Sequence, residues 1–434
     1  MYKNLNIMAK NEQIYAAVDI GTTKIVAVAG RKNEEGKIEI IGLGQSMSQG
    51  IKRGAVLNID EAYAAISEAV RKAEDSFGGD IDQVYVNLTG QQMKTESTKV
   101  QKYLEPGSVV SEEDMSHMYE QASQIPVQEG YKIYQISPQL FTIDNEVGIV
   151  NPVGTTGEKL EGEFKVFIAP EQYEMNIQKC FDRAGIRVKK IIIDPVASSE
   201  VILSEDEKEA GVVLLDIGGG TTKMSVYHDS VLCFSSVIPF GGNVITHDIK
   251  EGCSILLRQA ESLKTQFGQA MGDFAPAEKV VTIPGISGWE PKEISFKSLA
   301  FIIQARMEEI IDAFSFHLGK SGYFDKVGAG IVISGGTSLM PNLNQLVKYR
   351  TGSDVRNGVP NMKYFLAGKE LEDPRLGTAL GLLLLAANEE NGTRKQIRKK
   401  KKKVSEEGFF SQMKKQVARQ VTMFFEDEQD IEMK

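Results

Sequence analysis

The sequence predicts an α/β fold with two similar lobes. Strand-like apolar runs alternate with helix-like segments along most of the chain, which is typical of α/β proteins. A short block occurs twice: an apolar run, then Asp-Ile-Gly, then Thr-Thr-Lys and a second strand-like run. A further apolar run, 329–341, contains a glycine pair. The repeat indicates two related halves, and the third run adds a strand-and-glycine element of the same kind.

The longer copy of the block lies at 212–227. Four apolar residues lead to Asp216, and Gly218, Gly219 and Gly220 follow. Because glycine lacks a Cβ atom, such a run lets the backbone turn tightly. Consecutive N–H groups in a turn of this kind form a concave site for an anion. Taken alone, the stretch is equally compatible with a hairpin that has a glycine turn and no ligand.

The shorter copy lies at 14–28, where Asp19 is followed by Gly21, Thr22, Thr23 and Lys24. The separation of the copies is far too long for a solenoid repeat, so we expect two halves that face each other. Two such turns would close on one triphosphate from opposite sides. The aspartates at the two strand ends are suited to hold a hydrated Mg²⁺, which keeps most of its waters and takes one or two carboxylates.

Composition excludes several classes of protein. The 434 residues carry a net charge of −9, and eight of the ten residues 394–403 are Lys or Arg. The rest of the chain is therefore acidic, which argues against nucleic acid as the main partner. The three cysteines form no C-x-x-C pair, which is typical of a reducing cytosol. The four histidines form no H-E-x-x-H motif, so no metal site of that kind is expected.

Neither end of the body shows a membrane-spanning signal. Residues 1–13 lack the apolar core of a signal peptide; we expect them to be disordered, with Met1 or Met8 as the start. The most apolar stretch, 376–387, is shorter than the roughly 20 residues that span a bilayer. These features predict a cytoplasmic body.

The C-terminal tail has a different character. After a basic flexible linker at 389–407, residues 408–426 form an amphipathic pattern in which Lys415 and Arg419 lie opposite an apolar arc, while the stem of Lys414 snorkels from within it. The arc consists of Phe409, Phe410, Met413, Val417, Val421, Phe424 and Phe425. Such a helix suits a membrane interface, and basic residues near anionic lipid add roughly 1 kcal/mol each. Docking onto a partner or onto the chain's own body, and disorder, are the alternatives.

These residues together resemble the actin-fold ATPases, and within that superfamily the FtsA family of bacterial cell-division proteins. The resemblance extends over nearly the whole chain. Its motifs are DIGTTK (19–24), NPVG (151–154), VVLLDIGGGTTKMSVY (212–227), VIPFGGNVIT (237–246), AESLK (260–264) and GIVISGGTSLMPNL (330–343). It implies a two-lobed actin-like (ribonuclease H-like) ATPase fold with an inserted small α+β subdomain and a C-terminal amphipathic helix.

The resemblance also implies a division of the chain into segments. The first lobe would comprise 14–83 and 169–200, joined by a returning helix at 374–388. The inserted subdomain would take 84–168, in which Ser111 and Asp114 begin a helix. The second lobe would comprise 201–242 and 326–373, with an upper subdomain at 243–325.

The resemblance implies ATP and Mg²⁺ as cofactors, bound between the lobes. Asp19 and Asp216 would lie near Mg²⁺, held through water. The nucleotide contacts would be Gly21, Thr22, Thr23, Lys24, Gly218, Gly219, Gly220, Thr221, Thr222, Gly242, Gly335, Gly336 and Thr337. Glu261 would meet the ribose and Lys264 the base.

Hydrolysis is a separate question. In some actin-fold ATPases a carboxylate base occupies the position that matches Asp194, which stands before Pro195. A base must reach its water within about 2.6–3.2 Å. The same residue pair is equally typical of a helix start, so Asp194 is both a candidate base and a candidate helix-start residue, and any ATPase activity would be slow.

The implied function is a structural one. The chain would polymerise on the cytoplasmic face of the cell membrane at the division site, bind the C-terminal peptide of FtsZ through 243–325, contact anionic lipids through its tail, and recruit further division proteins for septum formation. The inserted subdomain would take part in polymer contacts, and no nucleic acid is expected. The alternatives are an actin-fold small-molecule kinase, an Hsp70-like chaperone and a pilus-assembly ATPase. A kinase would have no use for a terminal membrane helix, and a chaperone would need a large domain after residue 381.

Overall fold

The computed structural model describes residues 13–285, 290–366 and 368–389. The contacts divide the chain into residues 1–385 and 386–434. The sheets and the site below belong to the first of these units. The predicted tail helix at 408–426, its linker from 390 onward, and residues 1–12 with both candidate starts lie outside the described residues.

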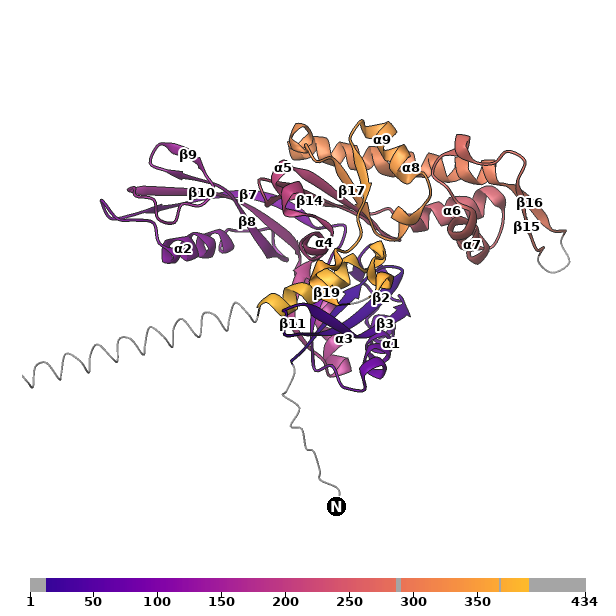
Figure 1. Ribbon diagram of the computed structural model, residues 1–434, viewed down its shortest axis with the longest axis horizontal. Coiled ribbons are helices and arrows are strands. Elements are labelled where there is room, and N and C mark those ends of the chain that lie inside the picture. Colours follow the sequence, from indigo (N-terminus) through magenta and orange to yellow (C-terminus); the bar gives the residue numbers. More distant parts are fainter. Residues whose placement is uncertain (1–12, 286–289, 367, 390–434) are drawn as a thin grey trace, which may run out of the picture. The chain divides into compact units, whose positions relative to one another are not determined.

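The first sheet has the order β11-β6-β1-β2-β3-β19. Strands β1, β2 and β3 are antiparallel neighbours, whereas β6 runs parallel to β1 and β11 parallel to β6. The strands are β1 (Ile14–Ile20), β2 (Lys24–Lys32), β3 (Ile38–Met47), β6 (Gln83–Leu88), β11 (Arg187–Ile193) and β19 (Phe365–Leu366), and a small hairpin, β4 (Ile51–Lys52) and β5 (Ala55–Val56), follows β3. Figure 1 shows the indigo strands β2 and β3 of this sheet close to the yellow helical residues before 386.

Helix α1 (Ile59–Phe77) lies very close to β3 because β3 carries glycines at the contact. A Cβ atom on Gly42 would lie 2.5 Å from the Ala73 carbonyl oxygen, and one on Gly44 would lie 2.0 Å from that of Ala69. A larger residue at either position would push the helix away from the sheet. The returning helical residues 377–385 reach β2, where a Cβ on Gly30 would lie 3.1 Å from a side-chain atom of Leu383.

The second sheet repeats this topology. Its order is β14-β13-β12-β17-β18, with three antiparallel strands followed by two parallel ones. The strands are β12 (Val212–Ile217), β13 (Thr222–His228), β14 (Val231–Ile238), β17 (Ile331–Ser334) and β18 (Val355–Asn357). The corresponding order in the first sheet is β3-β2-β1-β6-β11. The two related halves that the repeated block predicts are thereby confirmed at the level of strand order.

Helices connect and cover these sheets. Helix α3 (Glu171–Ala184) precedes β11 of the first sheet, and α4 (Asp194–Ile202) and α5 (Glu205–Ala210) connect β11 to β12 of the second sheet. The predicted upper part comprises α6 (Gly242–Cys253), α7 (Leu257–Phe267), the hairpin β15 (Val280–Ile283) and β16 (Lys292–Ser295), and α8 (Phe296–Ser321), while α9 (Leu343–Thr351) follows β17. Its apolar side chains, such as Leu263, Leu299 and Phe314, join one buried cluster with Val213 and Leu215 of β12. The upper part therefore shares its core with the second sheet.

The insert is a sheet of its own, in the order β7-β10-β8-β9. It comprises β7 (Lys94–Tyr103), α2 (Glu112–Ser123), β8 (Tyr131–Ile143), β9 (Glu146–Ile149) and β10 (Lys159–Pro170). Met118, Phe141 and Phe164 belong to its separate core. The predicted capping box is confirmed: the Ser111 side chain accepts from the Asp114 N–H, and the Asp114 carboxylate accepts from the Ser111 N–H.

Two predicted boundaries are wrong. Residues 84–88 were expected in the insert, but they form β6, which pairs with β1 and β11 of the first sheet. Residues 365–366 were expected in the second lobe, but as β19 they pair with β3 of the first sheet. Both errors have one cause: strand partners far apart in sequence leave no local signal. No helix among the described residues is long and apolar enough to cross a bilayer.

Candidate functional site

The two glycine turns are equivalent in the backbone. Gly21 N–H donates to the Lys24 carbonyl at 3.1 Å, and Gly218 N–H donates to the Thr221 carbonyl at 2.9 Å. In the first hairpin Ile20 is paired with Ile25, and in the second Ile217 is paired with Thr222. The turns are therefore residues 21–24 and 218–221, equal in length although the second sequence block contains two more glycines.

Because the two turns have the same length, the two lysines of the repeat occupy different positions in their hairpins. Lys24 closes its turn, whereas Lys223 lies on β13 directly opposite Asp216. The residue opposite Asp19 in the first hairpin is Val26. The repeated Thr-Thr-Lys block thus places its ammonium group at two different positions relative to the aspartate.

The turns touch each other. A Cβ on Gly219 would lie 1.9 Å from Thr23 Oγ1, and one on Gly220 would lie 2.5 Å from Thr22 Cγ2. Only glycine allows this approach, since any side chain here would separate the turns. Gly218 and Gly219 also accept hydrogen bonds from the first N–H groups of α6, at 2.9 and 2.7 Å.

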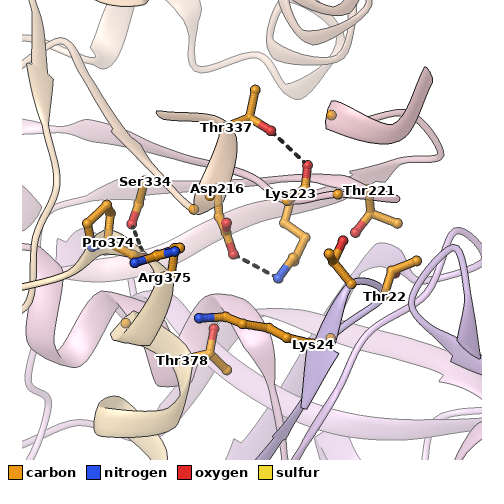
Figure 2. A pocket seen from close by; sticks show the side chains of 18 of the residues that line it. Thr22, Lys24, Asp216, Thr221, Lys223, Ser334, Thr337, Pro374, Arg375 and Thr378 are labelled. Atoms are coloured by element: carbon orange, nitrogen blue, oxygen red, sulfur yellow. Dashed lines mark hydrogen bonds and ion pairs between the residues drawn. The ribbon is translucent and has the colours of Figure 1, made fainter. Parts of the chain in front are cut away.

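A cavity of about 460 Å³ lies at these turns (Figure 2). It brings together residues from β1, β12, α6, α7 and the turn after β17. The predicted site residues that line it are Asp19, Gly21, Thr22, Thr23, Lys24, Asp216, Gly218, Gly219, Thr221, Gly242, Glu261, Lys264, Gly335, Gly336 and Thr337.

Three predicted site residues are not among those that line the cavity. Gly220 faces Thr22 of the other turn. Thr222 is buried and donates from Oγ1 to the Phe240 carbonyl at 2.9 Å. Asp194 is only 1% exposed and lies behind the cavity wall.

Asp194 belongs to a cluster of charged groups whose other members, Asp19, Asp216 and Lys223, line the cavity. Lys223 Nζ lies 2.6 Å from Asp194 Oδ2 and 2.7 Å from Asp216 Oδ2. Asn87 donates from Nδ2 to Asp194 Oδ1 at 2.7 Å and to Asp19 Oδ1 at 2.9 Å. Asn87 Oδ1 accepts from the Ile20 N–H at 2.6 Å, which fixes the orientation of the side-chain amide. Both oxygens of Asp194 are therefore bonded, and it stands at the first residue of α4 before Pro195.

Burial governs the acidity of these groups. It raises the pKa of Asp19 to about 7, with a further contribution from the Asp194 carboxylate, and it also raises the pKa of Asp194. Burial lowers the pKa of Lys223, but the surrounding carboxylates more than offset this, so its pKa lies above the ordinary lysine value. The pKa of Lys24 is lowered, first by burial.

Of the cationic side chains described at the cavity, Lys24 is the one whose ammonium group is free to bind a ligand. Among the described residues its ammonium group has no hydrogen-bond or ion-pair partner, and Lys24 lines the cavity together with Thr378 (Figure 2). At the same edge of the cavity Arg375 is held by Asp373, with its Nε 2.8 Å and its Nη2 2.6 Å from Asp373 Oδ2. An ammonium group without a partner in a partly apolar cavity favours an anionic ligand.

Glu261 and Lys264 also line the cavity. Lys264 Nζ lies 2.7 Å from Glu261 Oε2 and donates to the Gly242 carbonyl at 3.0 Å and to Thr246 Oγ1 at 2.7 Å. Thr337 Oγ1 donates to the Gly218 carbonyl at 3.1 Å, which joins the turn after β17 to the second glycine turn. The predicted ribose and base contacts thus lie on one cavity with the turns.

Among the residues at the site that the sequence analysis missed are Asn87, Lys223, Arg375 and Thr378. Lys223 was recoverable, because counting strand pairs outward from an equal-length turn places it opposite Asp216. Asn87 is a polar residue within an apolar strand, a weak signal by itself. Arg375 and Thr378 enter from the C-terminal end of the chain and have no local signature.

The carboxylates fit a hydrated divalent ion. Asp19 Oδ2 and Asp216 Oδ1 accept no hydrogen bond from any described residue, whereas the second oxygen of each is engaged by Asn87 or Lys223. One free oxygen from each strand end suits contact with metal-bound water. Within the described residues no cluster of three or more His, Cys, Asp or Glu side chains forms a direct metal site.

Comparison with known proteins identifies the family to which the chain belongs. A model described as "Cell division protein FtsA" matches residues 213–381, and one described as "SHS2 domain inserted in FTSA" matches residues 90–168. The cell division protein FtsA of Neisseria meningitidis serogroup B is 34% identical over 377 residues, which cover 87% of this chain and 91% of that protein. The chain belongs to the FtsA family. The FtsA of Escherichia coli K12 is 29% identical, over 87% of this chain and 91% of that protein.

Solved structures share the fold. A chain of the PilM-PilN type IV pilus biogenesis complex superposes with a TM-score of 0.60 at 15% identity, over 86% of this chain and 98% of that chain. MreB5 of Spiroplasma citri bound to ADP superposes with a TM-score of 0.50 at 12% identity, over 87% and 99%. The predicted actin-like fold is confirmed, and membership of the FtsA family sets aside the kinase, chaperone and pilus-assembly alternatives as family assignments.

Proposed function

We propose that this FtsA-family protein binds ATP in the cavity at its two glycine turns, polymerises on the cytoplasmic face of the cell membrane, and tethers FtsZ there for septum formation. The observation that carries the nucleotide part is the cavity itself. Two equivalent turns from two related halves, together with the unpartnered Lys24, converge on one space. MreB5, of the same fold, has been solved with ADP and with AMPPNP.

Each part of the nucleotide has a matching set of groups. The turn at 21–24, the turn at 218–221 and the Lys24 ammonium suit the phosphates. Glu261 suits the ribose hydroxyls, because a carboxylate oxygen accepts hydroxyl hydrogens. The ammonium group of Lys264 is already bonded to Glu261, Gly242 and Thr246, so Lys264 would lie beside the base and contact it through its apolar stem. Mg²⁺ would lie near the free oxygens of Asp19 and Asp216, where it would neutralise phosphate charge.

Slow turnover accords with this site. A general base must reach its water directly, and Asp194 has both oxygens bonded, one to Lys223 and one to Asn87. Asp194 as catalytic base stays a prediction. We therefore assign nucleotide binding mainly to the setting of filament geometry.

The membrane and partner assignments come from the sequence and the family. The amphipathic pattern at 408–426 and the basic run before it suit attachment to anionic lipid at the cytoplasmic face. We assign binding of the FtsZ C-terminal peptide to residues 243–325 and contacts between subunits of the polymer to the insert. Further division proteins would bind to surfaces that the sequence does not specify.

Three measurements on purified full-length protein test the proposal. Calorimetric titration with ATP should show one saturable site, and titration with the FtsZ C-terminal peptide from the same cell should show binding that a scrambled peptide lacks. Co-sedimentation with vesicles containing anionic lipid should be lost in a chain that ends at residue 389. Absence of ATP binding would remove the nucleotide assignment, and unchanged sedimentation of the shortened chain would remove the membrane assignment.

A further inference from the structure

The helical residues 377–385 begin at the cavity. Gly377 and Thr378 are the first two residues of this helix, and both line the cavity, as does Pro374 of the turn before it. None of the motifs that predicted the nucleotide site includes these residues. The C-terminal part of the chain therefore adds to the cavity a wall that the two glycine turns do not supply.

The side chain of Thr378 is polar and almost enclosed in this wall. The residue is only 6% exposed, and its hydroxyl has no hydrogen-bond partner among residues 13–285, 290–366 and 368–389. In Figure 2 the oxygen of this side chain points into the pocket. By contrast, the Ser198 and Ser334 hydroxyls in the same wall donate to backbone carbonyl groups of the fold. An enclosed hydroxyl without a partner costs free energy until a ligand completes its hydrogen bond.

The charges around this wall favour an anionic ligand. Burial has the largest effect on the pKa of Lys24, but the charges of Asp373 and Arg375 also act on it, so the residues before the helix lie within electrostatic range of that ammonium group. Asp373 and Arg375 are bonded to each other, with Arg375 Nε 2.9 Å from Asp373 Oδ1 and Arg375 Nη2 2.6 Å from Asp373 Oδ2. The carboxylates of Asp19 and Asp216, which act on Lys24 as well, are the groups assigned to hydrated Mg²⁺. The ligand that suits an ammonium group and a hydroxyl donor together is a phosphate, which has several acceptor oxygens and a negative charge.

We propose that Thr378 is a phosphate-binding residue of the nucleotide site, whose hydroxyl donates to a phosphate oxygen of ATP while Lys24 supplies the positive charge. The inference rests on the proposed nucleotide binding, and it adds the start of the helix at 377–385 to the two glycine turns as a third element that holds the phosphates. The unpartnered hydroxyl destabilises the empty protein and stabilises the complex, because only the ligand completes its hydrogen bond.

The test measures affinity by calorimetry on the full-length protein in buffer with Mg²⁺. Thr378→Val removes the hydroxyl and keeps the branched shape of the side chain. We expect its dissociation constant for ATP to rise roughly tenfold or more, because a hydrogen bond to a charged group is lost. The constant for adenosine should change by less than about twofold. Thr378→Ser, which keeps the hydroxyl, should bind ATP within about threefold of the unaltered protein.

The melting temperature of the unliganded protein separates this role from a structural one. Because no described group bonds to the Thr378 hydroxyl, Thr378→Val should leave that temperature unchanged or slightly raised, while the rise that ATP causes should become smaller. Thr351→Val is the matched control, since this helical threonine donates to the Val347 carbonyl at 2.7 Å and does not line the cavity. It should lower the melting temperature and leave the affinity for ATP unchanged.

The possible failures can be told apart. Unchanged ATP affinity in Thr378→Val, with binding intact in the unaltered protein, overturns the inference and leaves the proposed function standing. An equal loss for ATP and adenosine also overturns it, since the hydroxyl would then not face the phosphates. Two further results would show a packing role and overturn it: a Ser variant as weak as the Val variant, or a melting temperature that falls in Thr378→Val as it does in Thr351→Val. Absence of ATP binding by the unaltered protein instead overturns the proposed function, and the inference with it.

Discussion

Lys223 Nζ on β13 lies 2.6 Å from Asp194 Oδ2 at the start of α4. This ion pair joins the second sheet to the helix that leaves the first sheet, and the Asn87 amide extends it to Asp19. The two halves are thus linked below the cavity by buried charges as well as by apolar packing.

The linkage predicts strong coupling between the two partners. Removing one partner of a buried pair costs about 3–5 kcal/mol, because the other charge is left without compensation. Asp194→Asn and Lys223→Met should each lower the free energy of unfolding by about that amount, and the double variant by much less than their sum. Denaturant unfolding of the four proteins measures this.

The control for this cycle is Lys348 and Asp354, which are also 2.6 Å apart but have side chains 60% and 87% exposed. Their coupling should stay below about 1 kcal/mol. Additive effects of the Asp194 and Lys223 variants would contradict the linkage.

Gly335 should tolerate no side chain. Its φ of +85° is disfavoured for other residues, and a Cβ would lie 2.2 Å from Asp216 Oδ1 and 2.6 Å from the Ile217 carbonyl oxygen. Gly335→Ala should therefore lower the free energy of unfolding by about 3 kcal/mol. Gly336→Ala is the control, since its Cβ would meet nothing closer than Arg375 at 3.7 Å. Thermal melts that rank the two variants equally would contradict this.

The free energy of unfolding should depend on pH through the protonation of Asp19. Its pKa is raised from 3.8 to about 7 in the folded protein. Between these values the unfolded chain has released the proton and the folded chain keeps it, so rising pH favours the unfolded state. Relative to unaltered protein, Asp19→Asn should gain stability from pH 5 to about 7 and then level off. Denaturant titrations in EDTA without nucleotide measure the difference.

Asp114→Asn is the control variant, because the pKa of Asp114 is shifted in the opposite direction from that of Asp19. The pKa of Asp114 is lowered to about 2 by Lys102 and Ser111, so its stabilising effect is present above pH 3.8 and is lost only as pH falls toward 2. Across pH 5–8 this variant should therefore show a constant deficit. A pH-independent difference for Asp19→Asn would mean that Asp19 is already ionised at pH 5.

The insert should be fastened to the second sheet by Thr95. Its Oγ1 donates to the Ser235 carbonyl at 2.8 Å and accepts from the Ser235 N–H at 3.0 Å. Thr95→Val should lower the free energy of unfolding by about 1–2 kcal/mol and speed amide hydrogen exchange at Ser235. Thr98→Val, on the same strand, removes a hydroxyl that has no partner among the described residues. Equal exchange rates at Ser235 in both variants would show that the contact contributes nothing.

Lys24 should set the affinity for phosphate. Its side chain is half-buried and lines the cavity, so Lys24→Met should weaken ATP binding roughly tenfold or more and weaken adenosine binding much less. Lys52→Met, which removes an exposed lysine from the nearby hairpin, should leave both affinities unchanged. An equal loss for ATP and adenosine would place Lys24 away from the phosphates.

The predictable part of the fold was local. The repeated block, the glycine turns and the capping box at Ser111 are short-range patterns, and the structure contains all three. Strand β6 and strand β19 were misassigned because their partners β11 and β3 are far away in sequence. Asn87 and Arg375 were missed for the same reason.

The sequence by itself determined that two related halves each carry a glycine turn after an aspartate, because backbone freedom and strand periodicity depend on neighbouring residues. Only the tertiary structure decided which lysine is free and which is paired. Lys24 and Lys223 occupy the same place in the repeated sequence block, yet equal turns put them at different rungs of their hairpins. The carboxylates that engage one and spare the other come from elements that only folding brings together.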